Sequence, residues 1–80
     1  MRITYDSEAD ALYIELRPAT PADSLDIEDG VTADLDADGH VIGIEVLDVR
    51  ERLGRDALTS VILEQLPLTF QETIPAKGPG

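Results

Sequence analysis

The stretch "DLDADGHVIGIE", residues 34–45, decides how this chain folds. As a pattern it reads D-x-D-x-D-G-x5-E, which fits the calcium-binding loop of an EF-hand without a gap. The same letters place an Asp38-Gly39 pair between two runs of alternating apolar residues, which is the strongest short-range signal for a β-hairpin. The two interpretations predict different flanks, because an EF-hand loop lies between helices and a hairpin turn lies between strands.

The flanking residues favour the hairpin. The segment before the loop contains Gly30 and the β-branched pair Val31-Thr32, and it alternates with a period of two. The segment after it, "HVIGIEV", has four β-branched residues in seven. A two-residue turn at Asp38-Gly39 also sets apolar residues opposite one another: Leu35 with Ile42, Ala33 with Ile44, and Val31 with Val46. We therefore expect strands over 31–36 and 41–48 instead of an EF-hand.

Two segments nearer the N-terminus alternate in the same way. A four-residue loop, 7–10, between strands 2–6 and 11–16 pairs Tyr5 with Leu12 and Ile3 with Ile14, all on one face. A further strand over 24–27 is joined to 31–36 by a loop over 28–30, whose last residue is glycine, the residue suited to a left-handed conformation. This loop pairs Leu25 with Ala33 and Ile27 with Val31. Pro18 and Pro21 make 17–23 a linker.

The C-terminal third changes period. Apolar residues recur at spacings of three and four over 56–66, at Leu58, Val61, Ile62 and Leu66. Asp56 is a candidate N-cap and Pro67 a stop. We expect a helix over 56–66 that lies across one face of the sheet. Residues 68–74 form a short strand or an arm, and 76–80 a disordered tail, so that 1–75 make a single domain.

The predicted fold class is therefore α+β. It is an antiparallel β-sheet meander of about five strands, followed by one C-terminal helix. The strands are expected over 2–6, 11–16, 24–27, 31–36 and 41–48. Val41, Leu47 and Val49, with Tyr13 and Ala11, give the opposite side of this sheet a second apolar face. In a chain of 80 residues such a face suggests that a second sheet or a partner subunit covers that side.

Composition narrows the choice of partners. The chain has 17 Asp and Glu residues against six Lys and Arg, a net charge of −11, and no cysteine. This charge repels nucleic acid and attracts a basic protein or cations. No apolar run approaches the roughly 18 residues of a membrane span. The short chain has a marginal core and no disulfide or thiolate metal site to support it, which favours a homo-oligomer in the cytoplasm.

The sequence offers one candidate binding site and no catalytic one. In the hairpin register Asp34, Asp36 and Glu45 share the outward face, with Asp38 at the turn, and could hold a divalent cation loosely. An acidic, solvated surface is the alternative. The only histidine, His40, lies in the predicted turn, and no serine has a histidine nearby in any predicted pairing. We expect no enzyme activity and no cofactor.

Two blocks of sequence, "ITYDSEADALYIEL" and "EDGVTADLDADGHVIGIEVLD", resemble the DUF2283 family of small domains of unknown function. The resemblance covers about residues 2–53. It implies a compact antiparallel-sheet domain found in bacteria and archaea, without an assigned activity, cofactor or catalytic residue. We therefore expect a non-catalytic interaction domain that self-associates. The alternatives are an antitoxin-like acidic partner of a small basic protein, and weak cation binding at 34–45.

Overall fold

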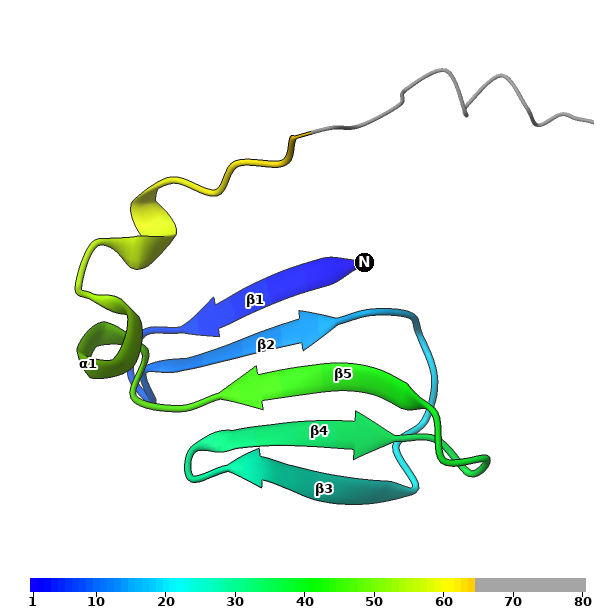
Figure 1. Ribbon diagram of the computed structural model, residues 1–80. Helices are drawn as coiled ribbons and strands as arrows, with labels where there is room; N and C mark the ends of the chain where they lie inside the picture. Colours follow the sequence, from blue (N-terminus) through cyan, green and yellow to red (C-terminus); the bar gives the residue numbers. More distant parts are fainter. Residues whose placement is uncertain (65–80) are drawn as a thin grey trace, which may run out of the picture.

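The alternating segments form one five-stranded antiparallel sheet in the computed structural model, which describes residues 1–64 (Figure 1). The strands are β1 (Arg2–Asp6), β2 (Ala11–Glu15), β3 (Asp23–Glu28), β4 (Val31–Leu35) and β5 (Val41–Val46). Their order across the sheet is β1-β2-β5-β4-β3. The β1–β2 hairpin and the β3–β4–β5 meander are thus joined through β2 and β5. The predicted fold class, an antiparallel sheet followed by a short helix, is confirmed.

The first hairpin has the predicted register. Tyr5 pairs with Leu12 and Ile3 with Ile14 across the four-residue loop. The Asp6 carboxylate closes this loop by accepting the backbone N–H groups of Glu8, at 2.9 Å, and Ala9, at 3.1 Å. This is the local aspartate–backbone bonding that stabilises such turns.

The residues on both sides of the turn within 34–45 form strands, as predicted. The match to the EF-hand pattern is therefore coincidental. Ala33 pairs with Ile44 and Val31 with Val46 as predicted. The turn itself is wider than predicted, because Asp36 N–H donates to the His40 carbonyl and Gly39 N–H to the Asp36 carbonyl. Gly39, with a φ of 86°, ends this longer turn, and Leu35 pairs with Val41 instead of Ile42. A register shift between Asp34 and Leu35 then restores the pairing of Asp34 with Gly43.

The β3–β4 connection also differs by one residue. Leu25 pairs with Ala33 as predicted, but Glu28, not Ile27, pairs with Val31. A bulge between Asp26 and Glu28 takes up the extra residue. Gly30 has the expected left-handed conformation, with a φ of 85°.

The helix lies earlier in the chain than predicted. It is α1 (Val49–Leu53), and the predicted span 56–66 has only a single 3-10 turn, η1 (Ala57–Thr59), followed by non-helical residues to 64. β5 ends at Val46 instead of residue 48, because Asp48 turns the chain with a φ of 54°. Two residues of the apolar stripe that predicted a helix, Val61 and Ile62, are exposed, and short helices are stabilised mainly by packing.

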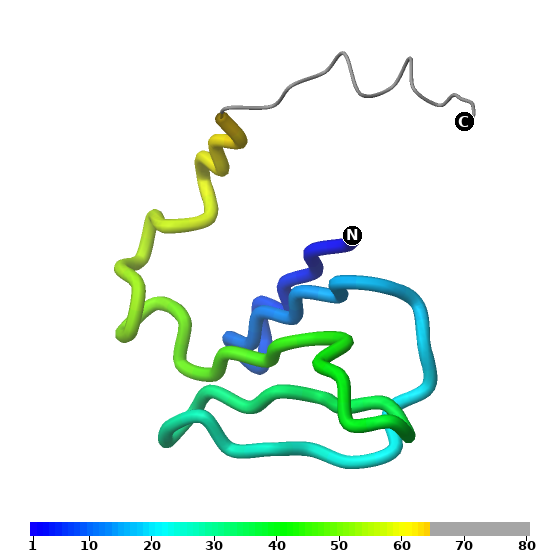
Figure 2. Tube along the Cα trace, turned by 45° about the vertical axis from the view of Figure 1, so that its right-hand side comes forward, coloured from blue at the N-terminus to red at the C-terminus, as the bar shows by residue number. Residues whose placement is uncertain are grey.

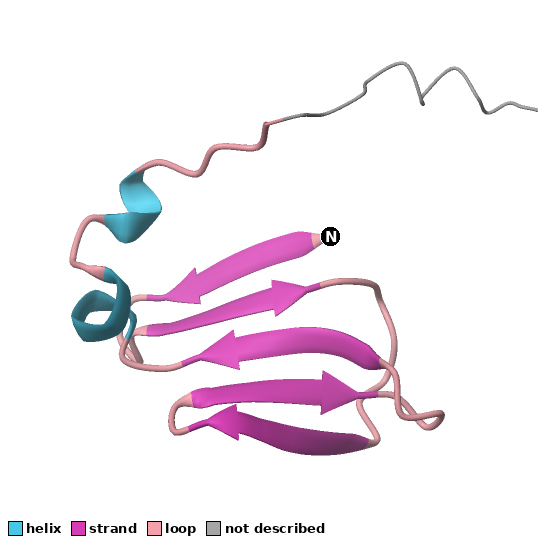
Figure 3. Ribbon diagram, viewed as in Figure 1, coloured by secondary structure: helices cyan, strands magenta, loops and turns pink. Residues whose placement is uncertain are grey.

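No helix among the described residues lies across a face of the sheet (Figures 1 and 3). α1 sits at one end of the sheet, near the β1–β2 loop, and the chain then leaves from that end (Figure 2). The principal packing between elements is strand against strand. Buried apolar residues in the described part are few: Leu12, Ala33, Ile42 and Val49.

Within residues 1–64, no helix is long and apolar enough to cross a bilayer. The predictions for 68–74 and 76–80, and the end of the predicted helix at 65–66, lie outside the described residues.

Candidate functional site

The two faces of the sheet differ sharply in chemistry. The registers and the alternation along each strand place nearly all apolar strand residues on one side, which we call the apolar face: Ile3, Tyr5, Leu12, Ile14, Leu25, Ile27, Val31, Ala33, Leu35, Ile44 and Val46. The other side, the polar face, carries Thr4, Tyr13, Glu15, Ser24, Asp26, Thr32, Asp34, Gly43 and Glu45.

The predicted second apolar face is wrong for one of its members, Val49. Val49 is not on the sheet but in α1, where it is buried, and Tyr13 uses its hydroxyl on the polar face. Val41 and Leu47 are exposed. The surface left without a covering layer in the described residues is instead the apolar face that was expected to be the core.

On the polar face a tyrosine side chain reaches from its own strand, across the neighbouring strand, to the strand beyond. Tyr13 on β2 donates a hydrogen bond of 2.8 Å to the Asp34 carboxylate on β4, and β5 lies between these two strands. The crossing is possible because the position beneath the phenol ring is Gly43, where any Cβ would collide with the Tyr13 hydroxyl and ring. The bond to Asp34 raises the pKa of Tyr13. The sequence indicated a bare spot at Gly43 opposite Asp34, and Tyr13 is what fills it.

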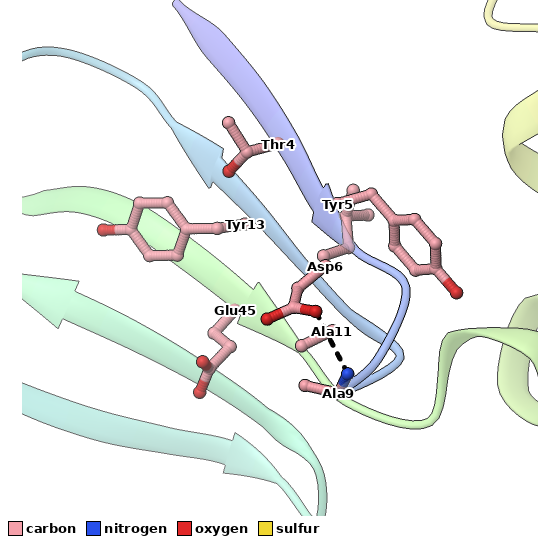
Figure 4. A pocket seen from close by; sticks show the side chains of 8 residues that line it. Thr4, Tyr5, Asp6, Ala9, Ala11, Tyr13 and Glu45 are labelled. Carbon is pink, nitrogen blue, oxygen red and sulfur yellow. Dashed lines mark hydrogen bonds between the residues drawn. The ribbon is translucent and has the colours of Figure 1, made fainter.

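Beside Tyr13 the polar face has a shallow hollow of about 320 Å³ (Figure 4). Asp6 and Glu45 supply its two carboxylates, and Ala9 and Ala11 its floor. Tyr5 points away from the other labelled side chains, toward the opposite side of the loop. Asp6 already accepts two backbone N–H groups, so the hollow has one carboxylate, that of Glu45, without a hydrogen bond among the described residues.

A second polar cluster joins the β1–β2 loop to α1. The Asp10 carboxylate accepts the Tyr5 hydroxyl at 2.6 Å and the Arg50 backbone N–H at 3.2 Å, and it pairs with the Arg50 guanidinium at 3.3 Å. The Asp10 carbonyl accepts the Val49 N–H at 3.1 Å. Asp10 therefore caps the first turn of α1 from a loop 40 residues away. The Tyr5 hydroxyl and then the Arg50 contacts lower the pKa of Asp10, and Asp10 raises that of Tyr5.

Arg52 holds the other side of α1. Its guanidinium pairs with Glu28 at 2.7 Å, donates to the Asp29 carbonyl at 2.5 Å and, through Nε, to the Leu47 carbonyl at 3.3 Å. It packs over Gly30, where a Cβ would meet it. α1 is thus fixed to the β1–β2 loop and to the β3–β4 loop.

The residues predicted to bind a cation are engaged separately. Asp34 accepts the Tyr13 hydroxyl, while Asp36 pairs with Arg17 and accepts the backbone N–H groups of Asp38 and His40, which lowers its pKa. Glu45 lies farther along β5, opposite Tyr13. Within residues 1–64, no group of three or more His, Cys, Asp or Glu side chains is arranged to hold a metal ion. The side chains of Asp34 and Asp36 thus make separate contacts around the hairpin.

The comparison with family models concerns the same residues. A model described as "Protein of unknown function (DUF2283)" matches residues 2–50. The chain belongs to the DUF2283 family. The DUF2283 match contains all five strands and the start of α1, and therefore the whole apolar face and the Tyr13–Gly43 and Tyr5–Asp10 contacts. No curated protein and no solved structure matches the chain.

The sequence of this DUF2283 chain does not reveal the long-range role of Asp10. An aspartate beside a loop is expected to bond neighbouring N–H groups, as Asp6 does, but the partners of Asp10 are Tyr5 and the distant Arg50. The structure shows why α1 needs this contact. Helix α1 begins after Asp48, whose side chain makes no capping bond, so its first N–H groups need another acceptor.

Proposed function

We propose that this domain is a non-catalytic self-association module, and that its apolar face binds the same face of a second copy. One observation carries the proposal: the sheet has a continuous apolar face, and nothing in residues 1–64 forms a second layer over it. A sheet with one apolar face is stable when that face packs against another layer.

The exposed side chains lie along the two edges of this face, while the apolar side chains of β2, β4 and β5 that lie on it are buried or half-buried. On the β1 edge Ile3 is 46% exposed, and on the β3 edge Leu25 is 56% and Ile27 55% exposed. Five strands of five residues cover about 24 Å by about 17 Å, or roughly 400 Å². The largest apolar patch of a typical soluble monomer covers about 300–600 Å² and is often an interaction site, and this face is of that size.

A second copy fits this face better than other partners do. The matched region, 2–50, includes the whole face and ends before the C-terminal segment, so a second copy is a covering layer that the domain itself supplies. Two such faces can pack about a two-fold axis as a β-sandwich. Because each chain carries a net charge of −11, contact through the apolar faces keeps the acidic polar faces apart.

Sedimentation or light scattering over a range of concentrations tests the proposal. The expected result is a dimer that dissociates on dilution and strengthens with added salt, which screens the repulsion between the two acidic chains. Leu25→Glu should give a folded monomer. The matched control is Ser24→Glu, which adds the same charge to the neighbouring residue on the polar face and should remain dimeric. A wild-type monomer at high concentration, or equal effects of both substitutions, would exclude this interface.

A non-catalytic role is supported by how the polar groups are used. His40 lies in the β4–β5 loop. The groups with shifted pKa values bond to other side chains, including arginines, or to backbone groups; they are Tyr5, Asp10, Tyr13 and Asp36. These contacts hold loops and strands together. The absence of cysteine suits a reducing cytoplasm, where we place the domain.

The acidic polar face favours a second candidate, a basic protein partner. Glu15, Asp26, Asp34 and Glu45 lie on this face, which stays outward in the proposed dimer. Such binding should weaken steeply with salt. Purification at moderate salt without any basic companion, together with failure to bind a lysine-rich peptide, would exclude this role and leave self-association untouched.

A further inference from the structure

A second pocket, of about 340 Å³, lies between the β1–β2 loop and the segment that follows α1. Tyr5 and Ser7 line it from the loop, and Val49, Arg50, Arg55 and Leu58 line it from the other side. Its size is at the lower end of the range for small-molecule sites.

The side chains that line this pocket carry net positive charge, whereas the whole chain is negatively charged. Acidic residues are 17 of the 80 in the sequence, yet none lines this pocket, whereas two of the six basic residues do. The hollow on the polar face, by contrast, is lined by Asp6 and Glu45. Asp10 lies behind the pocket wall, where it neutralises Arg50 and fixes its position.

The charge of Arg55 is available to a ligand. In residues 1–64 the other four arginines pair with carboxylates: Arg2 with Glu15, Arg17 with Asp36, Arg50 with Asp10, and Arg52 with Glu28. Arg55 has no such partner among these residues. Arg50 uses Nε on Asp10, and its side chain remains 60% exposed, so the far end of its guanidinium can still donate. Two guanidinium groups at one pocket suit a carboxylate, which accepts two parallel N–H bonds.

The remaining wall is apolar. Val49 is buried, Leu58 is half-buried, and the Tyr5 ring closes the side toward the sheet. We propose that this pocket binds a small carboxylate that carries a compact apolar group, with the carboxylate at Arg55 and Arg50 and the apolar group against Val49 and Leu58. The proposal is tested separately from self-association, because the substitutions used below do not change any residue of the apolar face.

Titration of the ¹⁵N-labelled full chain with phenylacetate tests this site by NMR. The expected result is a saturable shift of the amide signals of Ser7, Val49 and Arg55. Phenylacetamide, which has the same ring without the charge, and inorganic phosphate, which has charge without the ring, should each bind at least about tenfold more weakly.

Arg55→Gln should weaken phenylacetate binding about tenfold, because one charged partner is removed. Arg2→Gln is the matched control, since it removes an exposed arginine outside the pocket and should leave binding unchanged. Absence of saturable shifts, equal binding of phenylacetamide, or unchanged binding by a folded Arg55→Gln chain would each overturn the proposal. Tighter binding of phosphate would overturn the apolar part and make the pocket a site for inorganic anions.

Discussion

Tyr13 on β2 spans Gly43 on β5 and donates a 2.8 Å hydrogen bond to Asp34 on β4. This contact ties the β1–β2 hairpin to the β3–β4–β5 meander on the polar face, where few apolar contacts are available. β2 and β5 are neighbours in the sheet but are not joined by a turn. The contact therefore stabilises the junction between these two strands.

Gly43→Ala should destabilise the fold by about 1–3 kcal/mol, because the added methyl group collides with the Tyr13 ring. Chemical denaturation measures this loss. The same substitution in a Tyr13→Ala background should cost clearly less, since the colliding ring is gone. Equal costs in both backgrounds would show that the ring does not occupy this position.

At Gly39 glycine is needed for its backbone conformation and not to make room for a neighbouring side chain. Its φ is 86°, and an added Cβ would meet nothing within 4 Å, so the cost of Gly39→Ala comes from backbone conformation alone, about 1–2 kcal/mol. Gly39→Asn should cost less, because asparagine tolerates the left-handed conformation. Thermal melts of the two variants rank them, and equal destabilisation would argue against the bulged turn.

Asp10 should make stability depend on pH in acid. Its pKa is lowered by the Tyr5 hydroxyl and then by Arg50, so its contribution is complete above the ordinary value of 3.8 and is lost as pH falls through the lower folded value. Asp10→Asn should reduce the melting temperature at neutral pH and flatten its fall in acid. The control is Asp38→Asn, whose side chain has no hydrogen bond among the described residues. A curve for Asp10→Asn parallel to wild type would contradict this role.

The two tyrosines should make the stability of the fold depend on pH in alkaline solution. Asp10 raises the pKa of Tyr5 and Asp34 that of Tyr13, so both contributions are complete below the ordinary value of 10.0 and are lost as pH rises through the higher folded values. The sequence has only two tyrosines, so ultraviolet absorbance can follow both. Tyr5→Phe and Tyr13→Phe should each leave one late titration, and an ordinary titration for either remaining tyrosine would refute its bond.

Arg52 should stabilise the fold more through the several hydrogen bonds that its guanidinium makes at once than through its charge. Arg52→Lys keeps the charge but cannot reach Glu28, Asp29 and Leu47 together, and we expect a loss of about 1–2 kcal/mol. Arg2→Lys, at an exposed pair with a separation of 3.8 Å, is the control and should be nearly neutral. Urea denaturation compares them, and similar small effects would mean that Arg52 does not hold α1 to the β3–β4 turn.

The sequence by itself determined the strands. Side chains alternate between the faces at every residue, and a slip of one residue would bury polar groups, so Tyr5 and Leu12, or Ala33 and Ile44, could be paired in advance. The turn glycines, Gly30 and Gly39, were equally readable, because few other residues adopt their conformation.

Only the tertiary structure decided the bulges, the position of the helix and the contacts of Asp10. A bulge shifts the register by one residue without changing the pattern of apolar residues, so Leu35 could not be assigned to Val41 beforehand. The stripe at 56–66 had the period of a helix, but a helix this short forms where its apolar side is covered, and Val61, Ile62 and Leu63 are exposed. Asp10 and Arg50 are 40 residues apart, and they meet because the sheet brings the first loop to the end of β5.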